Sequence, residues 1–378
     1  MIKGVMIMRK IAEKGGNVLK IAALAAAVIF CTFDTAAAAG AVYISISRCL
    51  NVVIPSLFAM MAVSTVIVRS GVLTAVPKWC GRISRAISGM ERTIFPIFTF
   101  GMFAGYPVGV KMLCGEYSAG RLSKRRAELL SGLCFGAGPA FTFGCISHQL
   151  YSSDNAGKVI LISNISANLI LALIMSFFLR KSCGESSNGR KFSLSSDMLT
   201  GSVIQSGRAM ADICVMIIAF SVMNAVLVRI GAAAAVGELL TKLTCLDRRS
   251  GEAVVAAFLD ITNVSAFPCG DWLLLPYISA LVSFGGVCVM FQLSAITAGR
   301  ISLRPLILMR IAAAVISFRI CRLILPYFME YETVEVSAAA VSRNSGDPPV
   351  SSVMLVLMTV MLMWEMSGNS NKKPAEST

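Results

Sequence analysis

The stretch AGYPVGVKML, residues 104–113, interrupts a long apolar tract with three residues that disturb a helix, Gly105, Pro107 and Gly109. Glycine adopts backbone conformations that other residues avoid. Proline fixes its φ angle and removes a backbone donor, so it kinks or ends a helix. The tract is therefore expected to turn near these residues and not to run through as one straight helix.

Composition predicts the solvent in which this turn lies. Of the 378 residues, 56% are hydrophobic and only 14% are charged, whereas a soluble domain carries about 25% charged residues. Apolar runs near the roughly 20 residues that cross a bilayer recur along the chain. We interpret the net charge of +14 as basic loops on the cytoplasmic side of a membrane and not as a nucleic-acid surface. The predicted partner is the lipid bilayer.

Basic loops on both sides of the segment 94–114 predict how it meets the membrane. Residues 78–92 carry four Lys or Arg side chains, and so do residues 121–126. If 94–114 crossed the bilayer, one of these loops would lie outside, against the positive-inside bias. A re-entrant hairpin removes the conflict, because two arms of about ten residues reach roughly 15 Å into a core of about 30 Å. Gly105, Pro107 and Gly109 would form its tip.

A second hairpin is predicted at 252–275, because its stretch SAFPCGDWLL (265–274) repeats the pattern with Phe267, Pro268 and Gly270. Three pairs of short matches occur in the same order in the two halves of the chain: VIVRSG (66–71) with VLVRIG (226–231), YPVG (106–109) with FPCG (267–270), and FGAG (135–138) with FGGV (284–287). Loop charges place the two halves in opposite orientations. Inverted repeats of this kind characterise many secondary transporters.

The predicted fold is thus an all-α polytopic membrane protein with about eight spanning helices and two re-entrant hairpins arranged as inverted repeats. The expected spans are 20–46, 51–73, 129–149, 158–179, 208–231, 277–298, 306–328 and 350–364. The expected divisions are a basic N-terminus with the first span (1–50), a first repeat (51–180), a polar cytoplasmic connector (181–207), a second, inverted repeat (208–328), an acidic loop (329–349), and a last span with a tail (350–378).

The N-terminal region has two interpretations. Five Lys or Arg residues precede an apolar core and an alanine-rich run, as in a signal peptide. The alternative, which we adopt, is an uncleaved first span beginning near Lys20, with Asp34 near its far end. It places the N-terminus in the cytoplasm and the chain in the plasma membrane.

Several motifs resemble one family. They are VIPSLFAMMAVSTVIVRSG (53–71), GMFAGYPVGVKM (101–112), GAGPAFTFG (136–144) and FLDITN (258–263). With them, most of the chain resembles the sporulation integral membrane protein family typified by YlbJ. That family carries the nucleoside-recognition Gate domain shared with concentrative nucleoside transporters and spore maturation proteins. The resemblance implies a transporter-like fold and a role in forming endospores, and it names no cargo.

Candidate site residues fall into three groups. The two tips, Gly105-Tyr106-Pro107 with Gly109 and Phe267-Pro268 with Gly270, are expected to meet near the midplane, where Tyr106 and Phe267 either stack on a planar solute or only pack the tips. The motifs with Gly136, Gly138 and Pro139 and with Gly285 and Gly286 are expected to interrupt helices, either to bind a solute or to allow tight helix packing. Asp260, with Thr262 and Asn263, is an intramembrane carboxylate and a functional candidate unless it lies near the interface. Lys111 and Asp271, which follow the tips, are a candidate pair or gate.

The first functional hypothesis is a transporter or permease with a midplane site for a small polar solute and a coupling ion. The second is a non-transporting membrane scaffold for a sporulation complex, which is favoured by departures from the family motifs at Gly136, Ala137, Asn263 and Val264. The phosphate-loop, zinc-protease and nucleophile-elbow motifs do not occur, so no enzyme is expected. No cofactor or metal is predicted, and a homo-oligomer remains open.

Overall fold

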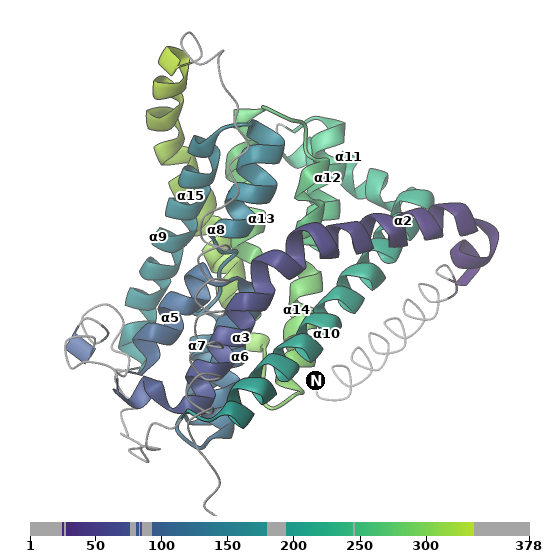
Figure 1. Ribbon diagram of the computed structural model, residues 1–378. Helices are drawn as coiled ribbons and strands as arrows, with labels where there is room; N and C mark the ends of the chain where they lie inside the picture. The colour runs from purple at the N-terminus through teal and green to yellow at the C-terminus, as the bar shows by residue number, and fades with distance from the viewer. Residues whose placement is uncertain are drawn as a thin grey trace, which may run out of the picture. The chain divides into compact units, whose positions relative to one another are not determined.

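The computed structural model describes residues 25, 28–75, 81–82, 84, 93–179, 194–244 and 246–335, and every element in this part of the chain is helical (Figure 1). Residues 1–328 form one compact unit. Of residues 329–378, the structure describes only 329–335, the end of the last helix. The elements in chain order are α2 (Thr35–Arg48), η1 (Cys49–Val53), α3 (Ile54–Ser70), η2 (Val72–Ala75), α5 (Ile94–Phe103), α6 (Tyr106–Ser118), α7 (Lys124–Ser131), α8 (Pro139–Phe141), η3 (Thr142–Tyr151), α9 (Asp154–Leu179), α10 (Ser196–Arg229), α11 (Ala232–Leu243), α12 (Arg248–Leu259), η5 (Ile261–Ala266), η6 (Trp272–Leu274), α13 (Leu275–Phe284), α14 (Gly286–Thr297) and α15 (Arg304–Glu335).

Four described helical segments are long and apolar enough to cross a membrane. They are Thr35–Ser70, Asp154–Ser176, Ser196–Arg229 and Trp272–Thr297. The chain is therefore all-helical and compatible with a multi-pass membrane protein. The number of predicted spans is larger than four, and the span 350–364 lies outside the described residues.

The predicted spans 20–46 and 51–73 are not two separate helices. Residues Thr35–Ser70 form one continuous helix in which the π-helical turn η1 joins α2 to α3. Pro55 lies in the first turn of α3, and a wider π turn before it accommodates the missing backbone donor with a bend. The chain breaks instead at Asp34, where φ is −124° and ψ is 54°, so Asp34 begins the helix and does not end a span.

The predicted connector 181–207 is also too long. Helix α10 begins at Ser196 because the hydroxyl of Ser195 accepts a hydrogen bond from the amide of Met198, 3.3 Å away. At the other end of the second half, α15 continues to Glu335 and takes in the first residues of the predicted acidic loop. Helix α11 was expected to be a loop.

Helices α2 and α3 pack antiparallel against α10 (Figure 1). Near the start of α10, the hydroxyls of Thr65 and Ser206 are 3.0 Å apart. Near its end, the Ser221 hydroxyl donates to the carbonyl of Ala41, and Arg229 forms an ion pair of 3.0 Å with Asp34. Helices α3 and α10 are counterparts in the two predicted repeats, and inverted repeats require them to run in opposite directions. The repeat itself remains a prediction.

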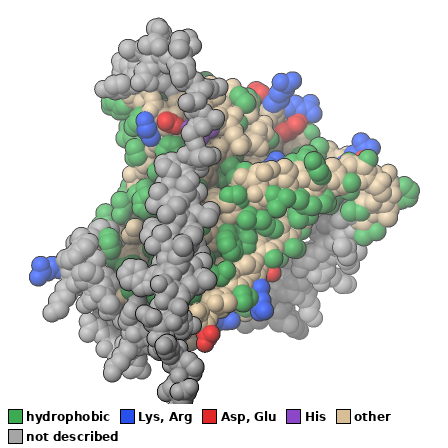
Figure 2. All heavy atoms as spheres, viewed as in Figure 1, with side chains coloured by type: hydrophobic (Ala, Val, Ile, Leu, Met, Phe, Trp, Pro, Cys, Tyr) green, Lys and Arg blue, Asp and Glu red, His purple; other side chains and the backbone are tan. Residues whose placement is uncertain are grey.

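Burial divides the apolar helices into an interior and an outer group. In the most apolar 18-residue stretch of Trp272–Thr297, 78% of the residues are buried. In the corresponding stretch of α10, only 22% of the residues are buried. Figure 2 shows hydrophobic side chains along the exposed faces of α2 and α10. They include Tyr43 and Val215, which are 76% and 62% exposed. Lipid contact explains such apolar surface on a membrane-spanning helix.

Candidate functional site

Four interruptions of helices gather in the interior. The first lies between α5 and α6, and the second is the non-helical run 132–138 between α7 and α8. The third follows α12, and the fourth separates α13 from α14. The turning residues are Gly105, with φ +98°, Gly138, with φ +76°, Asp260, and Gly285 with Gly286, at φ +89° and +83°. The predicted breaks at GAGP and FGG are both present. The predicted span 277–298 falls within the candidate membrane span Trp272–Thr297, whereas no candidate span among the described residues covers 129–149.

These interruptions touch one another pairwise. A Cβ built on Gly138 would lie 2.9 Å from the carbonyl oxygen of Phe103, so the second interruption packs directly against the backbone of the first. A Cβ on Gly286 would lie 3.0 Å from the amide nitrogen of Ile261, so the fourth interruption packs directly against the backbone of the third. Glycine is therefore needed at both positions to let two backbones approach. This arrangement supports the packing interpretation of these glycines.

Gly109 has a different role from the predicted one. It lies inside α6 and makes no turn. A Cβ on Gly109 would collide with the carbonyl oxygen of Cys134 and would lie 2.8 Å from Cα of Gly101 on α5. Likewise, a Cβ on Gly136 would lie 3.0 Å from the carbonyl oxygen of Met102. Gly109 thus closes the hairpin arms on each other, and only Gly105 and Pro107, in the first turn of α6, form the tip.

Tyr106 packs the first tip, which is the second of the two outcomes expected for it. Tyr106 contacts the rings of Phe135 and Phe141 at centroid distances of 4.9 and 6.4 Å, and its hydroxyl donates to the carbonyl of Val282 at 2.8 Å. The first tip therefore packs on the second break and on the end of α13. Tyr106 is buried here and has no free face for a solute.

The predicted second tip lies beside η3. The amide of Gly270 donates to the carbonyl of Leu150, and the Tyr151 hydroxyl donates to the carbonyl of Asp271. Phe267 is buried, and it precedes Pro268 in this turn. The turn is wide because η5 and η6 are short 3₁₀ segments that do not extend the arms as α-helices. Lys111 and Asp271 are not a pair, since the Asp271 carboxylate caps η6 through the amide of Leu273.

Asp260 is an interior carboxylate, as predicted. It is 1% exposed, and its two oxygens accept from the amide and the hydroxyl of Thr262 at 3.0 and 2.8 Å. Arg48 of α2 reaches the same cluster by donating to Oδ1 of Asn263 at 2.6 Å. No nitrogen of Arg48 lies within 4 Å of the Asp260 carboxylate, and the side-chain nitrogen of Asn263 donates to the carbonyl of Ala256 at 3.3 Å, not to Asp260. The cluster joins the first half to the third break.

Arg310 is a functional candidate that the sequence reasoning missed. It is fully buried in α15 and donates to the carbonyl oxygens of Gly132, Phe135 and Ser283 and to Oδ1 of Asn168. These carbonyls belong to the second break and to the turn before the fourth. The guanidinium therefore satisfies backbone carbonyls near the predicted binding residues Gly136 and Gly285, and not those of the predicted residues themselves. An arginine within the apolar segment 306–328 was the available signal.

A cavity of about 530 Å³ lies between α3, α6, α10 and α14, and of the predicted candidates Lys111 lines it. Its size falls in the range of small-molecule sites. Its charged side chains are five cations and one carboxylate: Arg69, Lys111, Arg121, Arg208, Arg300 and Asp212. Ser64, Thr65, Ser118 and Gln205 add polar groups. The wall is therefore strongly basic.

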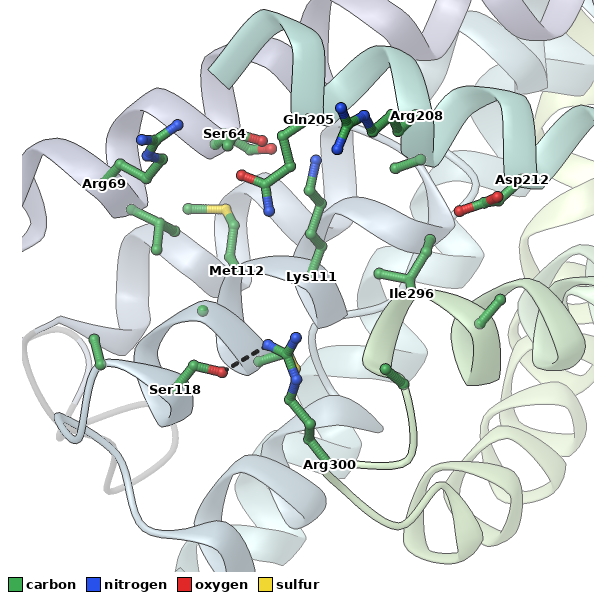
Figure 3. A pocket seen from close by; sticks show the side chains of 18 of the residues that line it. Ser64, Arg69, Lys111, Met112, Ser118, Gln205, Arg208, Asp212, Ile296 and Arg300 are labelled. Atoms are coloured by element: carbon green, nitrogen blue, oxygen red, sulfur yellow. Dashed lines mark hydrogen bonds between the residues drawn. The ribbon is translucent and has the colours of Figure 1, made fainter. Parts of the chain in front are cut away.

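Figure 3 shows how these side chains approach the cavity. The Lys111 amine extends from α6 between Gln205 and Arg208 of α10, and Arg300 enters from the turn after α14. Arg300 donates to the Ser118 hydroxyl at 3.0 Å, which joins the end of α6 to the second half of the chain. The positive φ angles of Ala298 and Gly299, +48° and +69°, shape that turn.

One of the five cations is neutralised within the protein. Arg121 makes two hydrogen bonds of 2.6 Å to the carboxylate of Glu116, which is 4% exposed, and a third to the carbonyl of Val68. This paired carboxylate raises the pKa of the Arg121 guanidinium. Four cations then face Asp212 alone, and such a cavity favours an anion.

Comparison with protein-family models, with curated protein sequences and with solved structures finds no match to this chain. The resemblance to the YlbJ family therefore stays a prediction from the quoted motifs.

Proposed function

We propose that this chain is a multi-pass plasma-membrane protein that acts as a secondary transporter or permease for a small polar solute, and that the solute is an anion. A role in endospore formation is part of the proposal and follows from the motif resemblance alone. The observation that carries the proposal is the cavity wall, which holds one carboxylate and four cations that have no carboxylate partner within 4 Å among the described residues.

The charges also support an orientation. Arg69, Arg121 and Arg300 line one cavity and so lie at one end of the antiparallel α3–α10 pair. The opposite end carries the ion pair between Asp34 and Arg229. The positive-inside bias assigns the cavity end to the cytoplasm. The α5–α6 hairpin, with arms of 10 and 13 residues, then enters and leaves at that face.

Both halves of the chain contribute to the cavity. Helices α3 and α6 belong to the first half, and α10 and α14 to the second. A movement of one half against the other would change the cavity walls and break the bond between Arg300 and Ser118. Such a movement is the basis of alternating access in transporters built from inverted repeats.

The test is ligand-induced stabilisation of the purified protein in detergent. Sulfate and oxalate serve as anionic probes, adenosine as a neutral one, and chloride holds the ionic strength equal. A ligand at about 100 times its Kd stabilises the folded state by about 2.7 kcal/mol. We expect the anions to raise Tm in the wild type and in Arg229→Gln, whose side chain lies outside the cavity, and much less in Arg208→Gln on the same helix.

Stabilisation by adenosine alone would contradict the assignment of an anion. Absence of any shift with a well-folded protein would favour the scaffold hypothesis. Uptake of labelled oxalate into proteoliposomes separates transport from binding, since a protein that only binds the anion would show the Tm shift without uptake.

A further inference from the structure

Lys111 occupies a distinct position among the cavity cations. It is partly buried, and its Nζ lies 3.3 Å from the Ser206 hydroxyl. That hydroxyl also contacts the hydroxyl of Thr65 and the carbonyl of Met61. The amine of α6 is thus held where α6 meets the α3–α10 pair.

No carboxylate among the described residues lies within 4 Å of Lys111 Nζ. The charged groups that face it are Arg69 from α3, Arg208 and Asp212 from α10, Arg121 from the turn after α6 and Arg300 from the turn after α14, with the Cys114 thiol on its own helix. Four of these are arginines, which keep their charge under all physiological conditions. Lys111 is therefore the cavity cation that can lose its charge.

The surroundings of Lys111 disfavour the ammonium form when the cavity holds no anion. Partial burial in the cavity wall removes water from the amine, and this loss of hydration disfavours its charged form. An anion within the cavity reverses this balance, because it attracts the ammonium across a short distance. Binding of the anion and binding of a proton at Lys111 then favour each other, and this coupling is reciprocal.

Resting on the proposed function, we propose that Lys111 binds the proton that accompanies the anion, so that the coupling ion of this protein is a proton. Loading of the cavity joins one anion to a protonated Lys111 Nζ. Release of the anion returns the amine to its poorly hydrated surroundings and frees the proton to water. Loading forms an N–H bond at Lys111 and breaks an O–H bond of a hydronium ion, release does the reverse, and no oxidant or reductant is needed.

The direction of the pH dependence follows from this linkage. The protonated protein binds the anion more tightly, so the affinity is highest at low pH. It falls as pH rises through the range in which the free Lys111 amine loses its proton. In that range the Kd is expected to increase about tenfold for each pH unit, because one proton is bound with each anion.

The experiment measures the Kd of oxalate, whose two carboxylates stay ionised throughout, from about pH 6 to about pH 10, the range in which a desolvated lysine titrates. Wild type is expected to lose affinity with rising pH. Lys111→Arg should bind with an affinity that does not change with pH, because its charge is permanent. Lys111→Met should bind weakly at every pH. Asp212→Asn should keep the wild-type slope.

A wild-type affinity independent of pH, a slope that survives in Lys111→Arg, or a slope that is lost in Asp212→Asn would each overturn the proposal and leave the anion site intact. A wild type that binds no anion at any pH would overturn the proposed function as well. Melting temperatures of the variants without ligand separate a loss of binding from a loss of folding.

Discussion

Gly109→Ala tests whether the hairpin α5–α6 depends on direct backbone contact. Gly109 faces the carbonyl of Cys134, and a methyl group there would lie 2.8 Å from Cα of Gly101. Carbon atoms pack at about 3.5–4.0 Å, so the arms must separate by about 1 Å. Neither neighbour is a flexible side chain that can rotate away.

The magnitude is the difference of two effects. Overpacking a tight interior costs about 1–3 kcal/mol, and contacts with backbone on both sides place this case near the upper end. Alanine in the interior of a helix is favoured over glycine by about 1 kcal/mol. The expected net loss is therefore about 2 kcal/mol of folding free energy.

Gly207→Ala in α10 is the matched control, because a Cβ there meets nothing within 4 Å. It gains helix propensity without a clash, and we expect about 1 kcal/mol of stabilisation. Both variants are compared by thermal unfolding in the same detergent, where 2 kcal/mol corresponds to a shift of a few degrees. A Gly109→Ala protein as stable as Gly207→Ala would refute the close contact between the arms and Cys134.

Two further variants test the buried charges. Arg310→Met removes the donors to Gly132, Phe135 and Ser283, of which Phe135 keeps Asn168 as a donor. We expect a loss of about 1–3 kcal/mol for each buried carbonyl left without a donor, seen as a lower Tm; an unchanged Tm would show that these carbonyls have other partners. Asp260→Asn keeps the shape of the cluster with Thr262 and is expected to abolish oxalate uptake without lowering the amount of protein in the membrane; normal uptake would show that the carboxylate is structural.

Much of the local structure was predictable because it depends on short-range chemistry. Gly105 turns the chain as predicted, because its φ of +98° is open to glycine and disfavoured for other residues. The breaks at Gly138 and Gly285 follow from the same property. The interior position of Asp260 was also predicted, since it follows an apolar run.

The predictions from sequence were wrong where the same residue type is compatible with two different local structures. Gly109 was assigned to a turn, but in α6 its missing side chain serves contact with Gly101. The spans 20–46 and 51–73 were expected to be separate, but a π turn before Pro55 joins α2 to α3 in one helix. The meeting of Tyr106 with Phe267 required two tips of equal reach, and the 3₁₀ segments after α12 do not provide it.

The sequence by itself determined that the chain is helical and apolar enough for a membrane and that it bends at its glycine motifs. These properties depend on composition and on the conformational limits of single residues. The tertiary structure alone decided that Arg310 fills the breaks and that Lys111, Arg208 and Arg300 share one cavity. The physical reason is distance along the chain: these side chains come from α15, α6, α10 and the turn after α14, and only packing of the two halves brings their charges together.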